Sequence, residues 1–425
     1  MEEKKVLYVI SEFFAPYHSV ASIKFTKITK FLAQKQEYKI YVFTRKNYKR
    51  EDDILNNDLL KIESLGGEVF VIDAGKNFYK TRKIEKTKLY KRFFKKTDSA
   101  KKYRKLHSRG MARFAKNGIR LIDENKIPAP DYVISTYDDY GAHMLGMKIK
   151  QRYGENVKWI TDFRDQVAIF YQDKKTREWA DEYTLKVSEM SDCTTVSFGM
   201  AQNMVFADKT DLRDIHIGFD YADGQKAKTI HKALTFTYSG SYYGNRTIRP
   251  LLQVISELID EGLAKREDFA FNYCGVMGSN IKKELDEFNL SNNYVDWGRV
   301  SHLQSLLIQE SSDILLSCIW NYYDYQGAIG GKTFEYLGLE KPIVAIVRGD
   351  MPESDMKKLI VRGECGVCYE EANHDEDIVR LKEKIYQYYT EKIKNGHIEH
   401  HNKYEEVRKY DLSYIANQYD EILKA

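Results

Sequence analysis

Two glycines, a lysine and a glutamate form the strongest candidate for a site of chemistry in this sequence. Gly330 and Gly331 let a ligand approach the backbone closely. A helix that begins near Gly331 would point free N–H groups and its positive dipole end at a phosphate. Lys332 adds a full charge, and Glu335 can accept hydrogen bonds from ribose hydroxyls. The competing interpretation is an ordinary glycine-started helix with a solvated lysine and glutamate.

A second candidate follows Tyr238–Gly240, which ends a predicted strand. Arg246 and Arg249 lie in the turn between this strand and the next predicted helix. Guanidinium groups at such a junction can clamp a diphosphate through paired hydrogen bonds. Two ordinary surface arginines remain the alternative.

Polar residues also follow three predicted strands of the first half. His18 and Ser19 lie in the loop after the first strand, where Ser19 can also cap the next helix. Asp138 follows the fourth strand, and Arg164 and Asp165 follow the fifth. Side chains at these strand ends can bind sugar hydroxyls or orient an acceptor, so they are candidate acceptor-side residues.

Short apolar runs that alternate with amphipathic stretches predict the elements that position these residues. The alternation predicts parallel sheets covered by helices on both faces. The expected strands are Val6–Ile10, Lys39–Phe43, Val69–Ile72, Tyr132–Ser135, Lys158–Asp162 and Thr194–Ser197, then Leu234–Tyr238, Phe269–Cys274, Tyr294–Trp297, Ile314–Cys318 and Ile343–Val347.

This alternation of predicted strands and helices stops at a polar stretch, Asp220–Lys232, and resumes after it. The sequence therefore predicts an α/β protein of two doubly wound halves. Ligands of open parallel sheets bind beyond the C-terminal ends of the strands. The cleft between two such halves is the expected binding site.

The composition is that of a globular protein. Of the 425 residues, 43% are hydrophobic and 31% charged, and the net charge of +4 does not by itself demand nucleic acid. The 5 scattered cysteines favour a reducing compartment over a disulfide scaffold. The start, MEEKKVLYVI, leads almost directly into a strand, so we expect no signal peptide. A cytoplasmic location is expected, with contact to a membrane surface still allowed.

Several kinds of cofactor site are not indicated. No GxGxxG follows the first strand and no GxxxxGK[ST] occurs, so neither a dinucleotide site nor a P-loop is expected. No Asp-x-Asp pair stands out in a loop, so a metal-dependent donor site is not expected either. Cys365 and Cys368 have metal-ligand spacing but no second pair, and we interpret them as strand cysteines. His143 is interpreted as a packed helix residue.

One segment departs from the general composition. Residues 76–116 hold 17 lysines or arginines against only Glu85 and Asp98, and aromatic residues are interleaved with them. A helix with one apolar face and a cationic remainder can lie on an anionic membrane surface. A solvated basic hairpin and a nucleic-acid contact are the alternatives, and no nucleic-acid motif accompanies the charge.

Several runs resemble the GT-B glycosyltransferases of the family four type, over nearly the whole chain. Gly331–Ala345 resembles the family signature K-x-F-E-Y-(M/L)-A-x-x-K-P-(I/V)-(I/V)-A. Val295–Ser301 resembles the F-x-G-x-V-(S/P) strand end that holds the nucleotide base, and Tyr238–Gly240 is similar to the opening of the donor domain. The other similar runs are Ile134–His143, Trp159–Asp165 with its D-x-R-D ending, and Gly363–Val367.

The resemblance implies a role for each matching residue. Glu335 matches the second glutamate of an E-x7-E motif, which binds ribose. Lys332 and Arg246 match basic residues on the leaving diphosphate, so these three residues form the implied catalytic set. The implied donor-binding residues are Gly240, Arg249, Arg299, Val300, Gly330, Gly331, Thr333 and Phe334.

Two positions depart from the family pattern. The first glutamate of E-x7-E would fall at Gly327, so sugar recognition must differ there. The family usually has a basic residue just after the domain-opening glycine. This chain has Ser241 there, and Arg249 is the candidate to supply the missing positive charge.

The resemblance therefore implies a glycosyltransferase of GT-B fold, with two Rossmann-like domains. It would move a sugar from a nucleotide-diphosphate sugar to a glycan, lipid-linked or polymer acceptor, with retention and without a metal, in bacterial surface polysaccharide synthesis. Residues 1–215 would bind the acceptor, 216–232 would link, 233–403 would bind the donor, and 404–425 would pack back on the first domain. The alternatives are a nucleotide-sugar epimerase of GT-B fold and a non-catalytic nucleotide- or glycan-binding protein.

Overall fold

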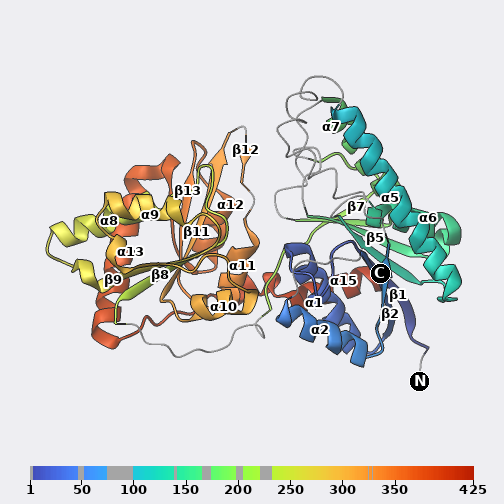
Figure 1. Cartoon of the computed structure of the whole chain (residues 1–425), viewed down its shortest axis with the longest axis horizontal. Helices are drawn as coiled ribbons and strands as arrows, with labels where there is room; N and C mark the ends of the chain where they lie inside the picture. The colour runs from blue at the N-terminus through green and yellow to red at the C-terminus, as the bar shows by residue number, and fades with distance from the viewer. Residues whose placement is uncertain are drawn as a thin grey trace. The chain divides into compact units, whose positions relative to one another are not determined.

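Two compact units make up the chain (Figure 1). The computed structural model describes residues 3–45, 52–73, 99–137, 141–164, 174–197, 204–220, 232–323, 325–327 and 329–425, without the side chains of 99–109, 175–176 and 325–326. Unit 1 comprises Met1–Ile217 and Ile415–Ala425, and unit 2 comprises Gly218–Tyr414. Part of the predicted terminal segment 404–425 thus belongs to unit 1.

Unit 1 is built on a parallel sheet with the strand order β3-β2-β1-β4-β5-β6-β7. The chain moves outward from β1 to β3 and then returns to place β4 on the other side of β1, which creates a switch point between β1 and β4. The strands are β1 (Lys5–Ser11), β2 (Tyr38–Arg45), β3 (Glu68–Ile72), β4 (Tyr132–Thr136), β5 (Lys158–Phe163), β6 (Cys193–Val196) and β7 (Asp211–Asp214).

Helices cover this sheet and begin where the sequence supplies a cap. The Ser19 hydroxyl accepts from Ser22 N at the start of α1, and the Asp52 carboxylate accepts from Ile54 N and Leu55 N at the start of α2. The helices are α1 (Val20–Gln34), α2 (Asp53–Ser64), α5 (Ser99–Glu124), α6 (Gly141–Tyr153), α7 (Lys174–Met190) and α15 (Leu412–Lys424), with the 3-10 turn η1 (Gly154–Asn156).

A buried ion pair lies inside unit 1. Lys24 Nζ donates to Asp162 Oδ1 at 2.7 Å, and both side chains are fully buried. The hydroxyls of Thr136, Thr195 and Tyr419 donate to the same carboxylate at 2.9, 2.9 and 3.0 Å. Burial opposes the charge of Asp162, but the Lys24 ammonium outweighs it and holds the pKa of this carboxyl below its usual value. This cluster joins α1, three strands and the C-terminal helix α15.

Unit 2 is a second parallel sheet, with the order β10-β9-β8-β11-β13-β14 and a short antiparallel strand β12 beside β11. The strands are β8 (Leu234–Ser239), β9 (Phe269–Cys274), β10 (Tyr294–Asp296), β11 (Ile314–Tyr322), β12 (Tyr325–Gln326), β13 (Ile343–Arg348) and β14 (Gly366–Glu370). Its helices are α8 (Arg249–Asp260), α9 (Gly278–Glu287), α10 (His302–Glu310), α11 (Gly331–Gly338), α12 (Asp355–Arg362), α13 (His374–Asn395) and α14 (Tyr404–Val407), with η5 (Arg266–Asp268), η6 (Ser291–Asn293), η7 (Glu371–Asn373) and η8 (Arg408–Tyr410).

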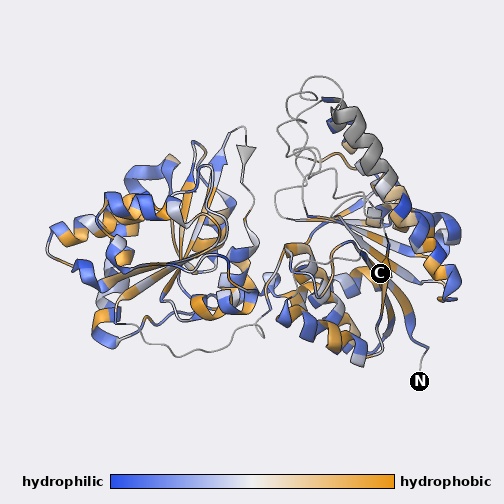
Figure 2. Cartoon of the chain, in the orientation of Figure 1, coloured by the Kyte–Doolittle hydropathy of each residue, from blue (hydrophilic) through white to orange (hydrophobic). Residues whose placement is uncertain are grey.

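Apolar residues gather on the strands and on the helix faces that cover them (Figure 2). Leu251, Ile255 and Leu258 of α8 are spaced by one helical turn and are buried on its sheet-facing side. The prediction of two doubly wound α/β halves is confirmed. Within the described ranges, no helix combines the length and the apolar run needed to cross a bilayer.

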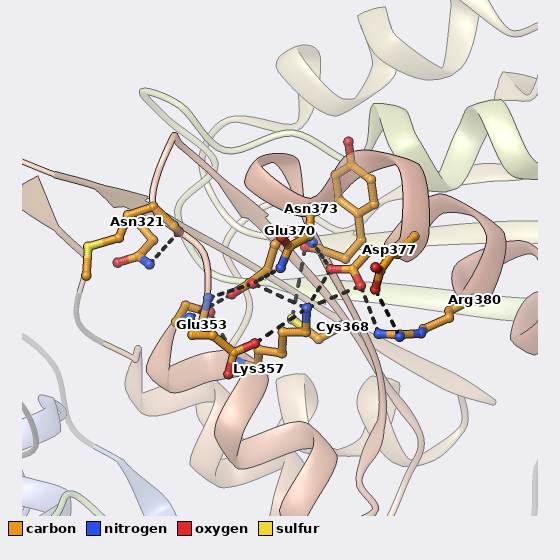
Figure 3. Close-up of polar contacts among 12 residues, drawn as sticks. Asn321, Glu353, Lys357, Cys368, Glu370, Asn373, Asp377 and Arg380 are labelled. Carbon is orange, nitrogen blue, oxygen red and sulfur yellow. Dashed lines mark hydrogen bonds and ion pairs between the residues drawn. The ribbon is translucent and has the colours of Figure 1, made fainter.

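A second buried charge cluster fixes α12 and α13 to β14 (Figure 3). Lys357 Nζ lies 3.0 Å from Asp377 Oδ2 and 3.4 Å from Glu370 Oε2. Glu370 also accepts from the backbone N–H groups of Glu353 and Ser354, at 2.9 and 2.7 Å. Glu370 thus holds the start of α12, and Asp377 binds Lys357 and the backbone N–H of Glu370, so the cluster is a structural element of unit 2.

Of the two cysteines with metal-like spacing, Cys368 lies beside this cluster. Cys368 is in β14, Cys365 directly precedes the strand, and both are buried free thiols. Burial raises the pKa of the Cys365 thiol to about 12. The interpretation as a strand cysteine is confirmed for Cys368, whereas Cys365 is the residue before the strand.

Candidate functional site

The glycine turn lies where the sequence predicted it, at the start of α11. The helix begins at Gly331, and the N-cap residue Gly330 has extended backbone angles. Gly330 has no side-chain oxygen, so it supplies no side-chain cap to the first N–H groups of the helix. This helix end is therefore suited to an anion.

Lys332, Glu335 and His302 meet within hydrogen-bond distance. Lys332 Nζ lies 2.6 and 2.8 Å from the two carboxylate oxygens of Glu335. His302 Nε2 lies 3.0 Å from Glu335 Oε2. The side chains of Lys332, Glu335 and His302 are 32%, 16% and 3% exposed, so the ammonium is the part of this cluster most open to solvent.

The carboxylate of Glu335 is ionised. Burial alone would raise the pKa of this group, but the nearby Lys332 ammonium and the hydrogen bond from His302 outweigh it and hold the pKa well below its ordinary value. An ionised carboxylate only accepts hydrogen bonds, so His302 Nε2 carries the proton of this contact.

The neighbouring side chains of α11 anchor the helix on the sheet. Thr333 Oγ1 lies 2.8 Å from Ser317 Oγ of β11. Ser239 N donates to Tyr336 OH at 3.0 Å, and the Phe334 ring is buried 5.3 Å from that of Tyr410. The side chains of Thr333 and Phe334 thus fix the helix, and their contact with a ligand would be through the backbone.

Arg246 is held beside the same part of β11. Its Nε donates to Cys318 O at 3.1 Å, and its Nη1 donates to Ser241 O at 3.1 Å. The guanidinium also lies over the rings of Tyr243 and Trp320, 4.5 and 5.2 Å from their centroids. These contacts leave the guanidinium half-buried and restrict its orientation.

The Arg246 and α11 segments both contact the part of β11 that extends past its pairing with β8. Leu316 pairs with Tyr238 near the end of β8, and β11 continues past it to Tyr322. Thr333 contacts Ser317 and Arg246 contacts Cys318, which are consecutive residues. Two predicted segments that are far apart in the chain thus contact neighbouring residues of β11.

The other predicted donor-side residues lie in different settings. Gly240 has φ +128, a conformation that favours glycine, directly after β8. Arg299 is exposed and Val300 half-buried in the turn after β10, which is joined to the β9 end because Gly275 N donates to Gly298 O. Arg249 makes a two-pronged ion pair with Glu287 of α9 at the surface, so this structure does not bring it to Lys332.

Gly327 has a physical reason to be a glycine. Its N–H donates to Trp320 O at 2.8 Å, and an added Cβ would lie 2.8 Å from the same oxygen. A glutamate, which the family pattern has at this position, would require the backbone to shift.

The acceptor-side candidates of unit 1 are partly in structural roles. His18 Nδ1 lies 2.6 Å from Asp52 Oδ2, and Ser19 caps α1. Arg164 is buried, and its Nη2 donates to Tyr137 O at 2.6 Å. Asp138 and Asp165 lie outside the described residues. The same holds for residues 76–98 of the basic segment, whose remainder includes most of α5.

Sequence reasoning missed His302 and the aromatic partners of Arg246. One local signal was present for His302: Ser301 and Gln304 form a capping box, which fixes the start of α10 and makes His302 its first residue. The contact between His302 of α10 and Glu335 of α11 depends on the strand order, and short motifs do not encode strand order.

No family model matches the chain, and no curated protein matches it. Solved structures are similar over 99% of this chain. Sucrose-phosphate synthase from Thermosynechococcus elongatus has a TM-score of 0.61 at 13% identity, over 98% of its chain. A trehalose-6-phosphate protein from E. coli, bound with UDP-2-fluoro glucose, has a TM-score of 0.61 at 10% identity, over 99% of its chain. UDP-GlcNAc 2-epimerase from Methanocaldococcus jannaschii has a TM-score of 0.53 at 13% identity, over 99% of its chain. The chain has the GT-B fold.

Proposed function

We propose that the protein is a glycosyltransferase that transfers a sugar from a nucleotide-diphosphate sugar to a glycan, lipid-linked or polymer acceptor. The observation that carries this proposal is that α11, with its glycine-capped start, Lys332 and Glu335, and the Arg246 segment contact neighbouring residues of β11, Ser317 and Cys318. Two cations and an open helix end fit a diphosphate, and a buried ionised carboxylate fits ribose hydroxyls. The GT-B likeness to a structure with a bound UDP-sugar analogue supports the same ligand class.

The chemistry follows from where charge develops. When the glycosidic bond breaks, negative charge accumulates on the leaving diphosphate. The N–H groups at the start of α11, the Lys332 ammonium and the Arg246 guanidinium would stabilise that charge. Under this proposal, protein cations supply the charge stabilisation, no metal ion is required, and the reaction proceeds with retention.

Nucleotide binding is the first expected result. UDP, GDP, ADP and CMP are compared by thermal shift, and one diphosphate is expected to raise the midpoint of thermal unfolding. Transfer from the corresponding nucleotide sugar should persist in EDTA. Binding only in the presence of a divalent cation would contradict the metal-free proposal. No shift with any nucleotide would contradict the donor site itself.

An epimerase is the second candidate, because a UDP-GlcNAc 2-epimerase shares the fold. The two reactions differ in their products. NMR of a UDP-sugar incubated with the protein alone distinguishes them, since an epimerase changes the sugar without an acceptor and a transferase does not. Conversion of the sugar at a rate independent of any acceptor would favour the epimerase.

We further propose that the basic segment 76–116 meets an anionic acceptor or membrane surface, in bacterial surface polysaccharide synthesis. Its 17 cationic residues carry this proposal. Vesicles of phosphatidylglycerol and phosphatidylcholine are expected to co-sediment the protein at low salt, and binding should fall at high salt because ions screen the attraction. Equal binding to pure phosphatidylcholine would contradict the electrostatic contact.

A further inference from the structure

We propose that His302 is a positioning residue, which holds the Glu335 carboxylate toward the donor ribose when Lys332 turns to the diphosphate. This inference rests on the proposed function and adds to it a residue and a sequence of contacts. The proposed binding has three steps, and each involves the Lys332–Glu335–His302 cluster.

The first step concerns Lys332. Its ammonium now lies on both oxygens of Glu335, at 2.6 and 2.8 Å. A diphosphate at the start of α11 carries more negative charge than this one carboxylate. Because the Lys332 side chain is 32% exposed on a flexible stem, it can turn toward that greater charge.

The second step concerns the carboxylate that Lys332 leaves. Glu335 is only 16% exposed, and a buried carboxylate without a partner is costly. His302 remains as its hydrogen-bond donor at 3.0 Å, from a side chain that is 3% exposed. Its position is fixed because the Ser301–Gln304 capping box sets the start of α10.

The third step concerns the ribose. A carboxylate offers about four acceptor positions. His302 occupies one of them on Oε2, and departure of Lys332 frees positions on both oxygens. The carboxylate can then accept from two neighbouring ribose hydroxyls, with its plane set by the histidine. Lys332 and His302 therefore serve different parts of the same nucleotide.

The test compares two substitutions of His302 by calorimetric titration with UDP and with 2′,3′-dideoxy-UDP, or with the GDP pair if GDP binds more tightly. His302→Leu removes the donor, and His302→Gln keeps an N–H at similar reach. We expect His302→Leu to weaken UDP binding about 10- to 100-fold, as for loss of a hydrogen bond to a charged group. Binding of the dideoxy nucleotide should not change, and His302→Gln should recover most of the affinity.

Uridine tests the order of the contacts, because it has no diphosphate to draw Lys332 away from Glu335. We expect His302→Leu to weaken UDP and to leave uridine binding nearly unchanged. Ser311→Ala is the matched control, because it removes the hydrogen bond from Ser311 Oγ to Ile308 O at the other end of the same helix and leaves His302 and its capping box in place.

The outcomes are distinguishable. If His302→Leu weakens UDP and dideoxy-UDP equally, or weakens neither, the positioning role is wrong although the donor site stands. If Ser311→Ala reproduces the ribose-dependent loss, the effect belongs to the helix as a whole and the positioning role is wrong. If the unsubstituted protein binds no nucleotide, the proposed function and this inference both fail.

Discussion

Replacing Lys332 with alanine is expected to lower the rate of sugar transfer about 100- to 1000-fold, the loss seen when one pre-organised donor to a developing negative charge is removed. The Lys332 ammonium is adjacent to the start of α11 and within 2.6 Å of Glu335. Steady-state kinetics with the donor found by thermal shift measure the effect. Because the charge on the diphosphate grows as the bond breaks, kcat should fall more than the donor KM rises.

Lys282→Ala is the control for loss of a surface lysine. Lys282 pairs with Asp286 on α9, and both side chains are about half exposed. This variant should keep its activity, since such exposed pairs contribute little to stability. Turnover of Lys332→Ala equal to that of Lys282→Ala would show that the diphosphate is bound elsewhere.

Replacing Asp162 with alanine should destabilise unit 1 by about 3–5 kcal/mol, because it leaves the Lys24 ammonium buried without its counter-charge. Urea denaturation followed by hydrogen exchange in α1 and β5 measures the loss in this unit. Asp123→Ala is the matched control: its ion pair with Arg152 is about half exposed, and its loss should cost less than 1 kcal/mol. Equal stability of the two variants would contradict the importance of the buried pair.

The same pair predicts a pH dependence. The pKa of Asp162 is depressed in the folded chain, where the Lys24 ammonium outweighs burial. Its contribution is therefore complete above the unfolded value, about pH 4, and is lost as the pH falls through the lower folded value. Asp162→Asn keeps the shape and removes the titration, so it also tests the contribution if the alanine variant fails to fold.

The apolar strands could be predicted because both sheets are covered on both faces. Buried runs such as Leu7–Ile10 and Ile343–Val347 have no polar alternation and stand out from their surroundings. The edge strand β7 was missed because Asp211–Asp214 is charged and exposed, as suits an edge. The exposed side chains of β7 carry no burial signal.

The start of α11 could be predicted from its glycines and lysine, but its partners could not. His302 reaches Glu335 because α10 and α11 follow different strands, and a linear motif carries no information on such a meeting. Arg249 has the same sequence context as Arg246, yet it pairs with Glu287 because α9 lies beside α8. Short motifs specify a helix end, whereas tertiary packing decides which side chains share it.

The helix α15 has a consequence for how the protein is made. Tyr419 is fully buried and donates to Asp162, so the core of unit 1 is completed by a helix that follows unit 2 in the chain. Domains usually fold in order as they leave the ribosome, beginning with the N-terminal one. Here the continuous segment Gly218–Tyr414 is synthesised before most of α15, so unit 2 can fold first and unit 1 must wait until α15 has also been made.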